Sequence, residues 1–468
     1  MTVPKRELDV DVAIIGAGTA GLNARRAALA AGAKRVVMIE GGPHGTTCAR
    51  VGCMPSKLLI AAAEAAHEIR HAGVFGVHAP PPQVDGPAVL RRVQSERDRF
   101  VGFVLRAVDD LPAEQKLTGY ARFVDASTLD VDDHTRVRAK SVVVAAGTEP
   151  FVPDGFESLG DRLLTNASVF ELPDLPRSLA VLGTGVIGLE LGQAMHRLGV
   201  DVTIINRSRR AGPARDPEVQ AVICEELSRE LDLRFDAHEL SARRVGDEVE
   251  LSFVDASGAA TTIRVERVLC ALGRRPSWER LAADRAGLPG DDSTSVSYDP
   301  HTMQVGSGPL FVAGDIVDER GVLHEAADEG RFAGTNAARY PHVRAFDRRA
   351  PLTVVFSDPQ IATVGVPYDE LDFASGQVVH GDVSYVDQGR ARVMAKNQGI
   401  VRVYGDRLSR RLIAAEMFGP RVEHTAHLLA WAIQQGMSVD AALRMPVYHP
   451  VVEEGIRTAL RRLAAAME

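Results

Sequence analysis

Short apolar runs, glycine turns and alanine-rich stretches alternate in the N-terminal part of the chain. The β-branched run Val10–Ile15 opens directly onto Gly16-Ala17-Gly18-Thr19-Ala20-Gly21, and a helical stretch follows. A second apolar run, Arg35–Ile39, ends in Glu40. A strand, a glycine turn, a helix and a second strand in this order predict a β-α-β unit of a parallel sheet.

The same pattern occurs again near the middle of the chain. The run Leu179–Leu182 leads into Gly183-Thr184-Gly185-Val186-Ile187-Gly188 and a predicted helix, and the strand Val202–Ile205 then ends in Asn206. Chance explains one such motif in full strand and helix context far more easily than two. The sequence therefore predicts an α/β fold with two Rossmann-like dinucleotide-binding domains.

The spacing of the glycines indicates what they do. Gly16 permits a tight turn, Gly18 lets the backbone approach a pyrophosphate, and Gly21 lets the helix pack on the strand. The second motif places glycines at the same three positions, which are Gly183, Gly185 and Gly188. A carboxylate about 20 residues past the glycines, here Glu40, accepts hydrogen bonds from a ribose hydroxyl. A glycine-rich turn without a ligand is the alternative interpretation.

The end of the second motif's strand carries arginines where the first carries an acid. Asn206 is followed by Arg207-Ser208-Arg209-Arg210. A carboxylate would repel a 2′-phosphate, whereas guanidinium groups bind one, so this run favours NADP over NAD, with Asn206 and Arg207 as candidate contacts. A solvated surface loop is the alternative.

Composition and charge narrow the class of protein. The chain has 468 residues, of which 45% are hydrophobic and 25% charged, and its formal net charge is −8. This balance is typical of a globular protein, and the length predicts about three domains. No basic block indicates nucleic acid or a membrane surface. Because residues 1–10 do not resemble a signal peptide and no apolar run could span a bilayer, we expect a cytoplasmic protein.

Two of the four cysteines, Cys48 and Cys53, lie close together. A disulfide over so short a loop would stabilise the fold by only about 2 kcal/mol, so a structural staple is a weak explanation. A metal site is the other alternative, but no second Cys or His pair has ligand spacing, and we predict no metal. A thiol near a helix start and a lysine becomes a usable thiolate, which favours redox chemistry. Cys224 and Cys270 lie in apolar surroundings and are expected to be inert.

The segment from Gly45 to Lys57 resembles the active-site signature of the pyridine nucleotide-disulfide oxidoreductases, the family of dihydrolipoamide dehydrogenase and glutathione reductase. Further motifs match that family in order along nearly the whole chain, namely Val142-Val143-Val144-Ala145-Ala146-Gly147-Thr148, Gly273-Arg274-Arg275-Pro276, Phe311-Val312-Ala313-Gly314-Asp315 and His449-Pro450. The resemblance implies FAD at the first glycine motif, NAD(P) at the second, and a Cys48–Cys53 disulfide that relays electrons between the flavin and a substrate.

The resemblance also implies roles for single residues. Lys57 and Glu190 would pair near the flavin, and the opposite charge would keep a partly buried lysine protonated; a surface ion pair is the alternative. Asp315 would bind the ribityl chain, and Glu40 the ribose of the ADP half. Further candidate contacts are Thr47, Ala121 and Gly147 for FAD, and Gly273 for NAD(P).

A histidine near the C-terminus completes the candidate site. Pro450 holds the backbone extended after His449, and a helix is predicted at Ile456–Leu463. The resemblance implies that His449 enters the partner subunit's site as a general acid-base and that Glu454 orients it. Glu453 is less suited to that role. A structural histidine is the alternative.

The resemblance implies four segments. These are an FAD-binding domain over residues 1–150, an NAD(P)-binding domain over 151–275, a returning FAD-side segment over 276–347, and an α+β dimerisation domain over 348–468 that forms a homodimer. Thr46 stands where the family usually has glycine, and Ala49-Arg50 where it usually has Leu-Asn. No cysteine follows Cys270, which disfavours mercuric reductases and the large thioredoxin reductases, since these need a C-terminal thiol pair.

Two features of the sequence disagree about the substrate. Pro55-Ser56-Lys57 resembles dihydrolipoamide dehydrogenases, whereas the basic run 207–210 resembles glutathione reductases. The main hypothesis is a dihydrolipoamide dehydrogenase-like enzyme acting on a dithiol or disulfide, such as the lipoyl group of a 2-oxoacid dehydrogenase complex. The alternatives are an NADPH-dependent reductase of another disulfide or of quinones, and a flavoprotein that serves mainly as a binding subunit of a larger complex.

Overall fold

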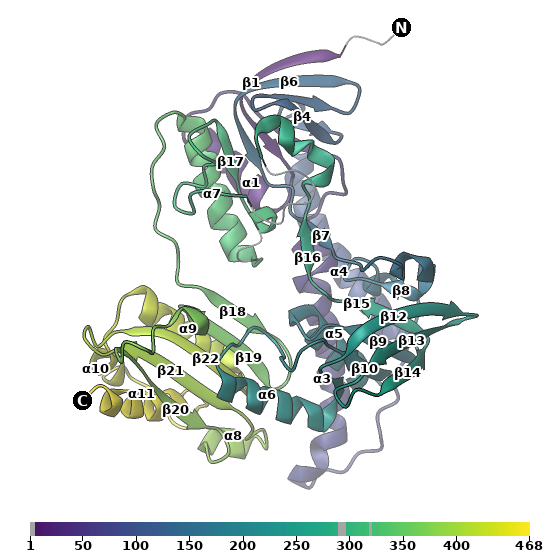
Figure 1. Ribbon diagram of the computed structural model, residues 1–468, viewed down its shortest axis with the longest axis vertical. Coiled ribbons are helices and arrows are strands. Elements are labelled where there is room, and N and C mark those ends of the chain that lie inside the picture. The colour runs from purple at the N-terminus through teal and green to yellow at the C-terminus, as the bar shows by residue number, and fades with distance from the viewer. Residues whose placement is uncertain (1–4, 289–295, 318–320) are drawn as a thin grey trace. The chain divides into compact units, whose positions relative to one another are not determined.

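The structure is a computed structural model that describes residues 5–288, 296–317 and 321–468 (Figure 1). Close contacts group the chain into two units, which are described separately. Unit 1 comprises Met1–Pro55, Gln94–Phe151 and Gly273–Arg348, and unit 2 comprises Ser56–Val93, Val152–Leu272 and Arg349–Glu468. The division into four domains with limits near residues 150, 275 and 347 stays a prediction.

Unit 1 is built on a sheet with the strand order β3-β2-β1-β6-β5-β4, and β17 also pairs with β6. The first half of β6 forms antiparallel pairs with β5, and its second half runs parallel to β17. Its strands are β1 (Arg6–Ile15), β2 (Val36–Glu40), β3 (Lys116–Thr118), β4 (Ala121–Asp125), β5 (Thr128–Val131), β6 (Thr135–Val144) and β17 (Leu310–Val312). A separate two-stranded ribbon pairs β7 (Thr148–Pro150) with β16 (Arg274–Pro276). The predicted β-α-β unit is confirmed, and Glu40 is the last residue of β2.

Two helices, α1 (Thr19–Ala30) and α7 (Leu323–Arg339), pack against each other in unit 1 (Figure 1). A Cβ atom on Gly330 would lie 2.2 Å from the carbonyl oxygen of Ala20, so only glycine permits this approach. The same unit contains α2 (Thr47–Val51) and the start of α3 (Cys53–His71), and α4 (Gly86–Asp109) ends in it.

Unit 2 contains a sheet whose strands all pair in parallel, with the order β11-β10-β9-β15-β8. The chain connects its strands through α5 (Val186–Arg197) and α6 (Pro217–Glu230), and an antiparallel sheet β12-β13-β14 follows. The strands are β8 (Leu163–Leu164), β9 (Ser178–Leu182), β10 (Asp201–Ile205), β11 (Asp232–Arg234), β12 (His238–Val245), β13 (Glu248–Val254), β14 (Ala260–Val265) and β15 (Arg267–Cys270). Cys224 on α6 and Cys270 on β15 are both buried, as predicted.

The C-terminal part of unit 2 is an antiparallel sheet with the order β18-β19-β22-β21-β20, covered by helices. Its elements are β18 (Leu352–Val355), β19 (Gln360–Gly365), β20 (Val378–Ser384), α8 (Gly389–Val393), β21 (Ile400–Asp406), β22 (Leu412–Gly419), α9 (Val422–Gln434), α10 (Val439–Leu443) and α11 (Glu454–Ala466). The predicted α/β fold, with two Rossmann-like β-α-β regions and a C-terminal α+β part, is confirmed. Among the described residues, no helix is both long enough and apolar enough to cross a bilayer.

A buried ion pair ties α6 to the C-terminal sheet within unit 2. The Asp216 carboxylate caps α6 by accepting from the Glu218 amide at 2.8 Å. It also accepts from Nη1 of Arg402 on β21 at 2.6 Å and from the Tyr404 hydroxyl at 2.6 Å. Asp216 is completely buried and Arg402 nearly so. Two segments far apart in the sequence are therefore fastened by one fully paired carboxylate.

Candidate functional site

The first glycine motif forms a tight turn from β1 into α1. Gly16 has a φ of +104°, and a Cβ atom there would lie 2.3 Å from the Ala145 carbonyl oxygen. A Cβ atom on Gly21 would lie 2.0 Å from the carbonyl oxygen of Gly16. Around Gly18 the Cβ position is open to 4 Å, and within the described residues no side chain caps α1. The first amides of α1 are therefore available to donate hydrogen bonds to an anion. Helix N-termini bind phosphate in this way.

Glu40 is held at the end of β2 by the motif itself. Its two carboxylate oxygens accept from the amides of Ala17 and Gly42, both at 2.8 Å. Each oxygen keeps a second lone pair for another donor. Glu40 therefore presents a fixed acceptor beside the glycine turn, where the sequence predicts a ribose hydroxyl.

The turn that carries Asp315 is fastened by a buried glutamate. Gly314, with a φ of +78°, donates its amide to the Glu329 carboxylate on α7 at 2.8 Å. Arg348 donates to Glu329 at 2.6 Å and to Glu325 at 3.1 Å. Burial raises the pKa of Glu329 to about 7, although Arg348 opposes the shift. Sequence reasoning missed Glu329, but two acids one turn apart on the alanine-lined face of α7 could have indicated it.

The remaining predicted FAD contacts lie on elements of unit 1. Ala121 is buried at the start of β4, and Gly147 follows β6 with a φ of +69°. Thr47 is exposed at the start of α2. Next to Gly147, the Thr148 hydroxyl accepts from Nε of Arg274 at 2.7 Å. This hydrogen bond helps to hold β16 against β7 in the two-stranded ribbon that follows β6.

The second glycine motif repeats the geometry of the first in unit 2. Gly183 has a φ of +103°, and a Cβ atom on Gly188 would lie 2.0 Å from the Gly183 carbonyl oxygen. The Cβ position of Gly185 is open to 4 Å, and no described side chain caps α5. A Cβ atom on Gly183 would lie 2.5 Å from the Ala271 carbonyl oxygen, two residues before Gly273. Gly273 itself, with a φ of +104°, begins the return of the chain to unit 1.

The basic run is anchored to this second glycine turn. Thr184 donates its hydroxyl to the Arg210 carbonyl, and its own carbonyl accepts from the Gly212 amide at 2.8 Å. The Asn206 side-chain amide donates to the Ser208 carbonyl at 2.8 Å. The loop backbone is therefore fixed beside the motif while the Arg207 side chain is exposed. Thr184 was not predicted, and the sequence offers no sign of its bridging role.

The two cysteines lie at the starts of two consecutive helices, α2 and α3, in the part of the chain that belongs to unit 1. Cys48 is the second residue of α2 and half-buried, and Cys53 is exposed at the start of α3. A Cβ atom on Gly52 would lie 3.2 Å from the Cys48 Cα atom, so the chain folds back closely between them. Both thiols lie in the first turn of a helix, an environment that favours the thiolate.

Thr46, immediately before α2, has a φ of +62° and a ψ of 148°. This region of backbone conformation is essentially restricted to glycine, which explains why glycine is usual at this position in related signatures. The Thr46 hydroxyl accepts from the Ala49 amide at 3.2 Å and caps α2. Threonine at this position therefore strains the backbone, and its hydroxyl caps the helix that carries Cys48.

Lys57 and Glu190 form the predicted pair within unit 2. The Lys57 ammonium lies 2.7 Å from one Glu190 oxygen and 2.8 Å from the other. Glu190 also accepts from the Phe356 amide at 3.0 Å, and Lys57 lies 4.6 Å from the centre of the Phe356 ring. The Glu190 side chain is only 4% exposed, so the alternative of a surface ion pair does not describe it.

His449 and Glu454 also meet, in the C-terminal part of unit 2. Nδ1 of His449 lies 2.9 Å from Oε1 of Glu454, and the Val451 amide donates to the same carboxylate at 3.1 Å. The hydrogen bond with His449 lowers the pKa of Glu454. The imidazole is 81% exposed, so Nε2 faces outward with its tautomer defined by the carboxylate. Such a pair can accept and return a proton at Nε2.

Within each unit, the predicted residues form local groups. Glu40 lies at the first glycine turn, and Asn206 lies in the loop beside the second. Lys57 pairs with Glu190, and His449 pairs with Glu454. The cysteines belong to unit 1, whereas the histidine and its carboxylate belong to unit 2.

The fold and these motifs define a class of protein. Residues 10–330 match the family described as pyridine nucleotide-disulphide oxidoreductase, and residues 352–460 match its dimerisation domain. The chain belongs to this family. It is a flavoprotein disulfide oxidoreductase, and its family is FAD-dependent and uses NAD(P)H.

Individual relatives extend over nearly the whole chain. A dihydrolipoyl dehydrogenase of Thermus scotoductus is 30% identical over 97% of both chains. A mercuric reductase of Streptomyces lividans is 33% identical over 94% of this chain and 93% of its own. Among solved structures, LpdA of Mycobacterium tuberculosis superposes with a TM-score of 0.82 at 24% identity, over 97% of this chain and all of its own. The structural likeness supports the fold alone.

Proposed function

We propose that the protein is a dihydrolipoamide dehydrogenase-like enzyme that interconverts a small dithiol and its disulfide using NAD(P)H. The proposal depends chiefly on the His449–Glu454 hydrogen bond at 2.9 Å, because a polarised, exposed imidazole is what proton transfer to and from a substrate thiol requires. Similarity to dihydrolipoyl dehydrogenases over whole chains supports the substrate class. The balanced reaction converts a dithiol and NAD(P)⁺ into a disulfide, NAD(P)H and one proton.

The first glycine motif fits the ADP half of FAD. The open space at Gly18, the uncapped start of α1 and the Glu40 acceptor are what a pyrophosphate and a ribose need. Asp315 would hold the ribityl chain. Bound FAD would supply the two-electron step between the nicotinamide and the cysteines. Lys57, held by Glu190, would place a positive charge near the flavin.

The cysteines and the histidine would divide the thiol chemistry. Cys53 would face the flavin, and Cys48 would exchange with the substrate sulfur. His449 of one subunit would receive the proton of the substrate thiol at Nε2 in the partner's site, so that a homodimer is the working form. Cys53→Ser should abolish disulfide turnover; if disulfide turnover persisted, the proposed electron path would be wrong. Survival of quinone reduction alone would identify the flavin as the reactive end.

NADP is the proposed second dinucleotide, with Arg207 as the proposed contact of the 2′-phosphate. The anchored loop 206–212 supports this, because its backbone is fixed beside the second glycine turn. Arg207→Glu should raise KM for NADPH by about tenfold and leave KM for NADH nearly unchanged. Arg99→Glu, the same charge change at an exposed residue of α4, is the control. An unchanged NADPH preference in the Arg207 variant would refute the assignment.

The basic loop also favours a second candidate, an NADPH-dependent reductase of another disulfide. A steady-state comparison of NADH with NADPH, each with lipoamide, glutathione disulfide and a quinone, separates the two. Preference for lipoamide supports the first function. Preference for another disulfide with NADPH supports the second.

A further inference from the structure

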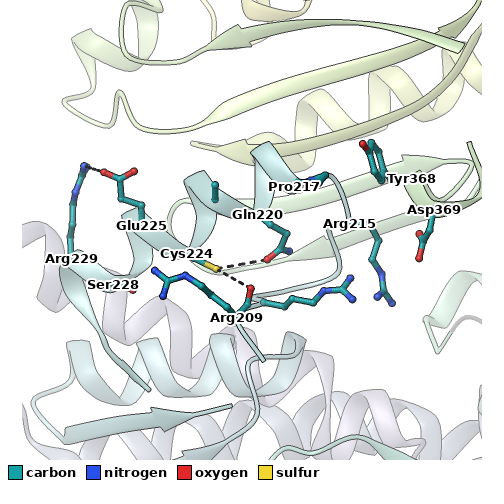
Figure 2. Close-up of a pocket in the computed structure, with 12 residues that line it drawn as sticks. Arg209, Arg215, Pro217, Gln220, Cys224, Glu225, Ser228, Arg229, Tyr368 and Asp369 are labelled. Carbon is teal, nitrogen blue, oxygen red and sulfur yellow. Dashed lines mark hydrogen bonds and ion pairs between the residues drawn. The ribbon is translucent and has the colours of Figure 1, made fainter. Parts of the chain in front are cut away.

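An open groove of about 920 Å³ runs along α6 in unit 2. It includes Arg209 and Arg210 of the basic run, but Arg207, the proposed contact of the 2′-phosphate, does not line it. Figure 2 shows Arg229 and Ser228 at one end, Arg215 and Tyr368 at the other, and Arg209 between them. We refer to it as the arginine groove. One of its walls is the loop between β10 and α6, and η8 (Tyr368–Glu370) closes one end.

The groove carries uncompensated positive charge. Four arginines and two carboxylates line it. Arg229 is neutralised by Glu225 at 2.8 Å and by Glu226. For the other three, Arg209, Arg210 and Arg215, no carboxylate of the described chain lies within ion-pair distance. This concentration of guanidinium groups contrasts with the net charge of −8 for the whole chain.

The backbone beneath these arginines is rigidly held, which distinguishes the groove from a solvated loop. Gln220, buried on α6, donates its side-chain amide to the carbonyls of Ala211 and Ala214 at 2.9 and 2.7 Å. The Arg215 amide donates to the buried Glu416 carboxylate at 2.8 Å. The Arg209 guanidinium lies over the Phe235 ring, 5.8 Å from its centre. Because the backbone that carries these arginines is already ordered, binding a ligand loses less conformational entropy.

The shape of the groove indicates an extended ligand with two chemically different faces. From Pro217 to Ser228, α6 rises about 17 Å, which corresponds to about five residues of extended polypeptide. Its floor includes Pro217, Ala221 and the buried Cys224, which offer apolar contact. In an extended peptide, alternate side chains point to opposite sides. Carboxylates on one side could meet the guanidinium forks while apolar side chains meet the floor.

We propose that the arginine groove binds an acidic, extended peptide segment of a partner protein. A single phosphate would use only part of the groove, because Arg209, Arg210 and Arg215 all precede α6 and the groove continues along the helix to Ser228. The proposal does not depend on the enzyme's substrate or on Arg207. It shares Arg209 and Arg210 with the basic run, whereas Arg215 and the residues of α6 lie outside that run.

Fluorescence anisotropy of the intact FAD-loaded protein tests the proposal. The probe is a fluorescein-labelled hexapeptide that alternates glutamate with leucine, and its glutamine counterpart is the uncharged control. Arg209→Glu and Arg215→Glu should each weaken binding by about tenfold, and Arg99→Glu should not. Affinity should also fall as salt rises. All three substitutions are at exposed positions, so the variants should keep the fold.

Three outcomes would overturn the proposal. The first is equal binding of the charged peptide by the wild type and both groove variants, or no binding at all. The second is arginine-dependent binding of inorganic tripolyphosphate without binding of the peptide, which would make the groove a small-polyanion site. The third is a rise in KM for NADPH in both groove variants that parallels the loss of peptide binding, because the arginines would then belong to the dinucleotide site. Failure of NADP specificity at Arg207 would leave the peptide result unaffected.

Discussion

Replacing Glu329 by glutamine should remove a pH-dependent loss of stability from unit 1. Glu329 is 2% exposed, and burial raises its pKa from 4.5 to about 7. The folded chain therefore binds this proton more tightly than the unfolded chain does. Ionisation of Glu329 thus lowers the stability of the folded state as the pH rises from 4.5 to 7, and the loss is constant above that range. Glutamine keeps an oxygen acceptor for the Gly314 amide but does not ionise.

The size of the effect follows from the shift. A rise from 4.5 to about 7, at 1.36 kcal/mol for each pKa unit, corresponds to about 3 kcal/mol, most of which is lost between pH 5 and pH 8. The free energy of unfolding of the glutamine variant, relative to wild type, should therefore be higher at pH 8 than at pH 5 by about 2 to 3 kcal/mol. Urea-induced release of FAD, followed by flavin fluorescence at both pH values, measures this difference.

A matched control separates the effect of burying the Glu329 carboxyl from the effect of the substitution itself. Glu114→Gln makes the same chemical change at an exposed position of unit 1, and its stability relative to wild type should not change with pH. The reasoning about Glu329 is refuted if Glu329→Gln follows wild type at both pH values, or if its relative stability falls as the pH rises.

Three further substitutions probe the two units. Thr46→Gly should stabilise the fold by about 1 kcal/mol in urea unfolding, because glycine relaxes the backbone and costs only a few tenths as a cap; destabilisation would show that the cap dominates. Glu454→Gln should slow disulfide turnover at least about tenfold while NADPH still reduces the flavin at the wild-type rate in stopped-flow experiments; a slower flavin reduction would contradict a role confined to His449. Asp216→Ala should cost about 3 to 5 kcal/mol in thermal unfolding because it leaves Arg402 buried without its partner, and a loss under 1 kcal/mol would contradict this.

The sequence predicted most of the backbone around the dinucleotide motifs, because the determinants there are local. Gly16 and Gly183 both have the positive φ angles that a tight turn needs, and each motif follows its strand directly. Glu40 ends β2 as expected. These features depend on residues within about 25 positions of each other, so strand, turn and helix propensities suffice to identify them.

Contacts between distant segments could not be predicted in the same way. The Arg348–Glu329 pair, the Asp216–Arg402 pair and the bridge from Thr184 to the basic loop depend on the packing of whole elements. A charged residue on a helix is usually solvated, so a local pattern rarely marks those that become buried. The two acids one turn apart on α7 indicate a buried carboxylate but not its partner Arg348. Pairs such as Lys57–Glu190 were predictable only because the resemblance to a family supplied the partner.

Comparison of the two dinucleotide turns explains how one chain can hold two different nucleotides. Their glycines adopt matching φ angles, 104° at Gly16 and 103° at Gly183, so the turns themselves do not discriminate. The proposed discrimination depends on the residue at the end of the second strand, which is Glu40 in β2 and Asn206 directly after β10. The Glu40 carboxylate accepts from the Ala17 amide beside its turn, and a carboxylate there would repel a 2′-phosphate. The Asn206 side-chain amide donates within its own loop, which leaves Arg207 as the nearest charged residue in sequence. The first turn is therefore suited to an unphosphorylated ribose, which supports the proposed assignment of FAD to the first site and NADP to the second.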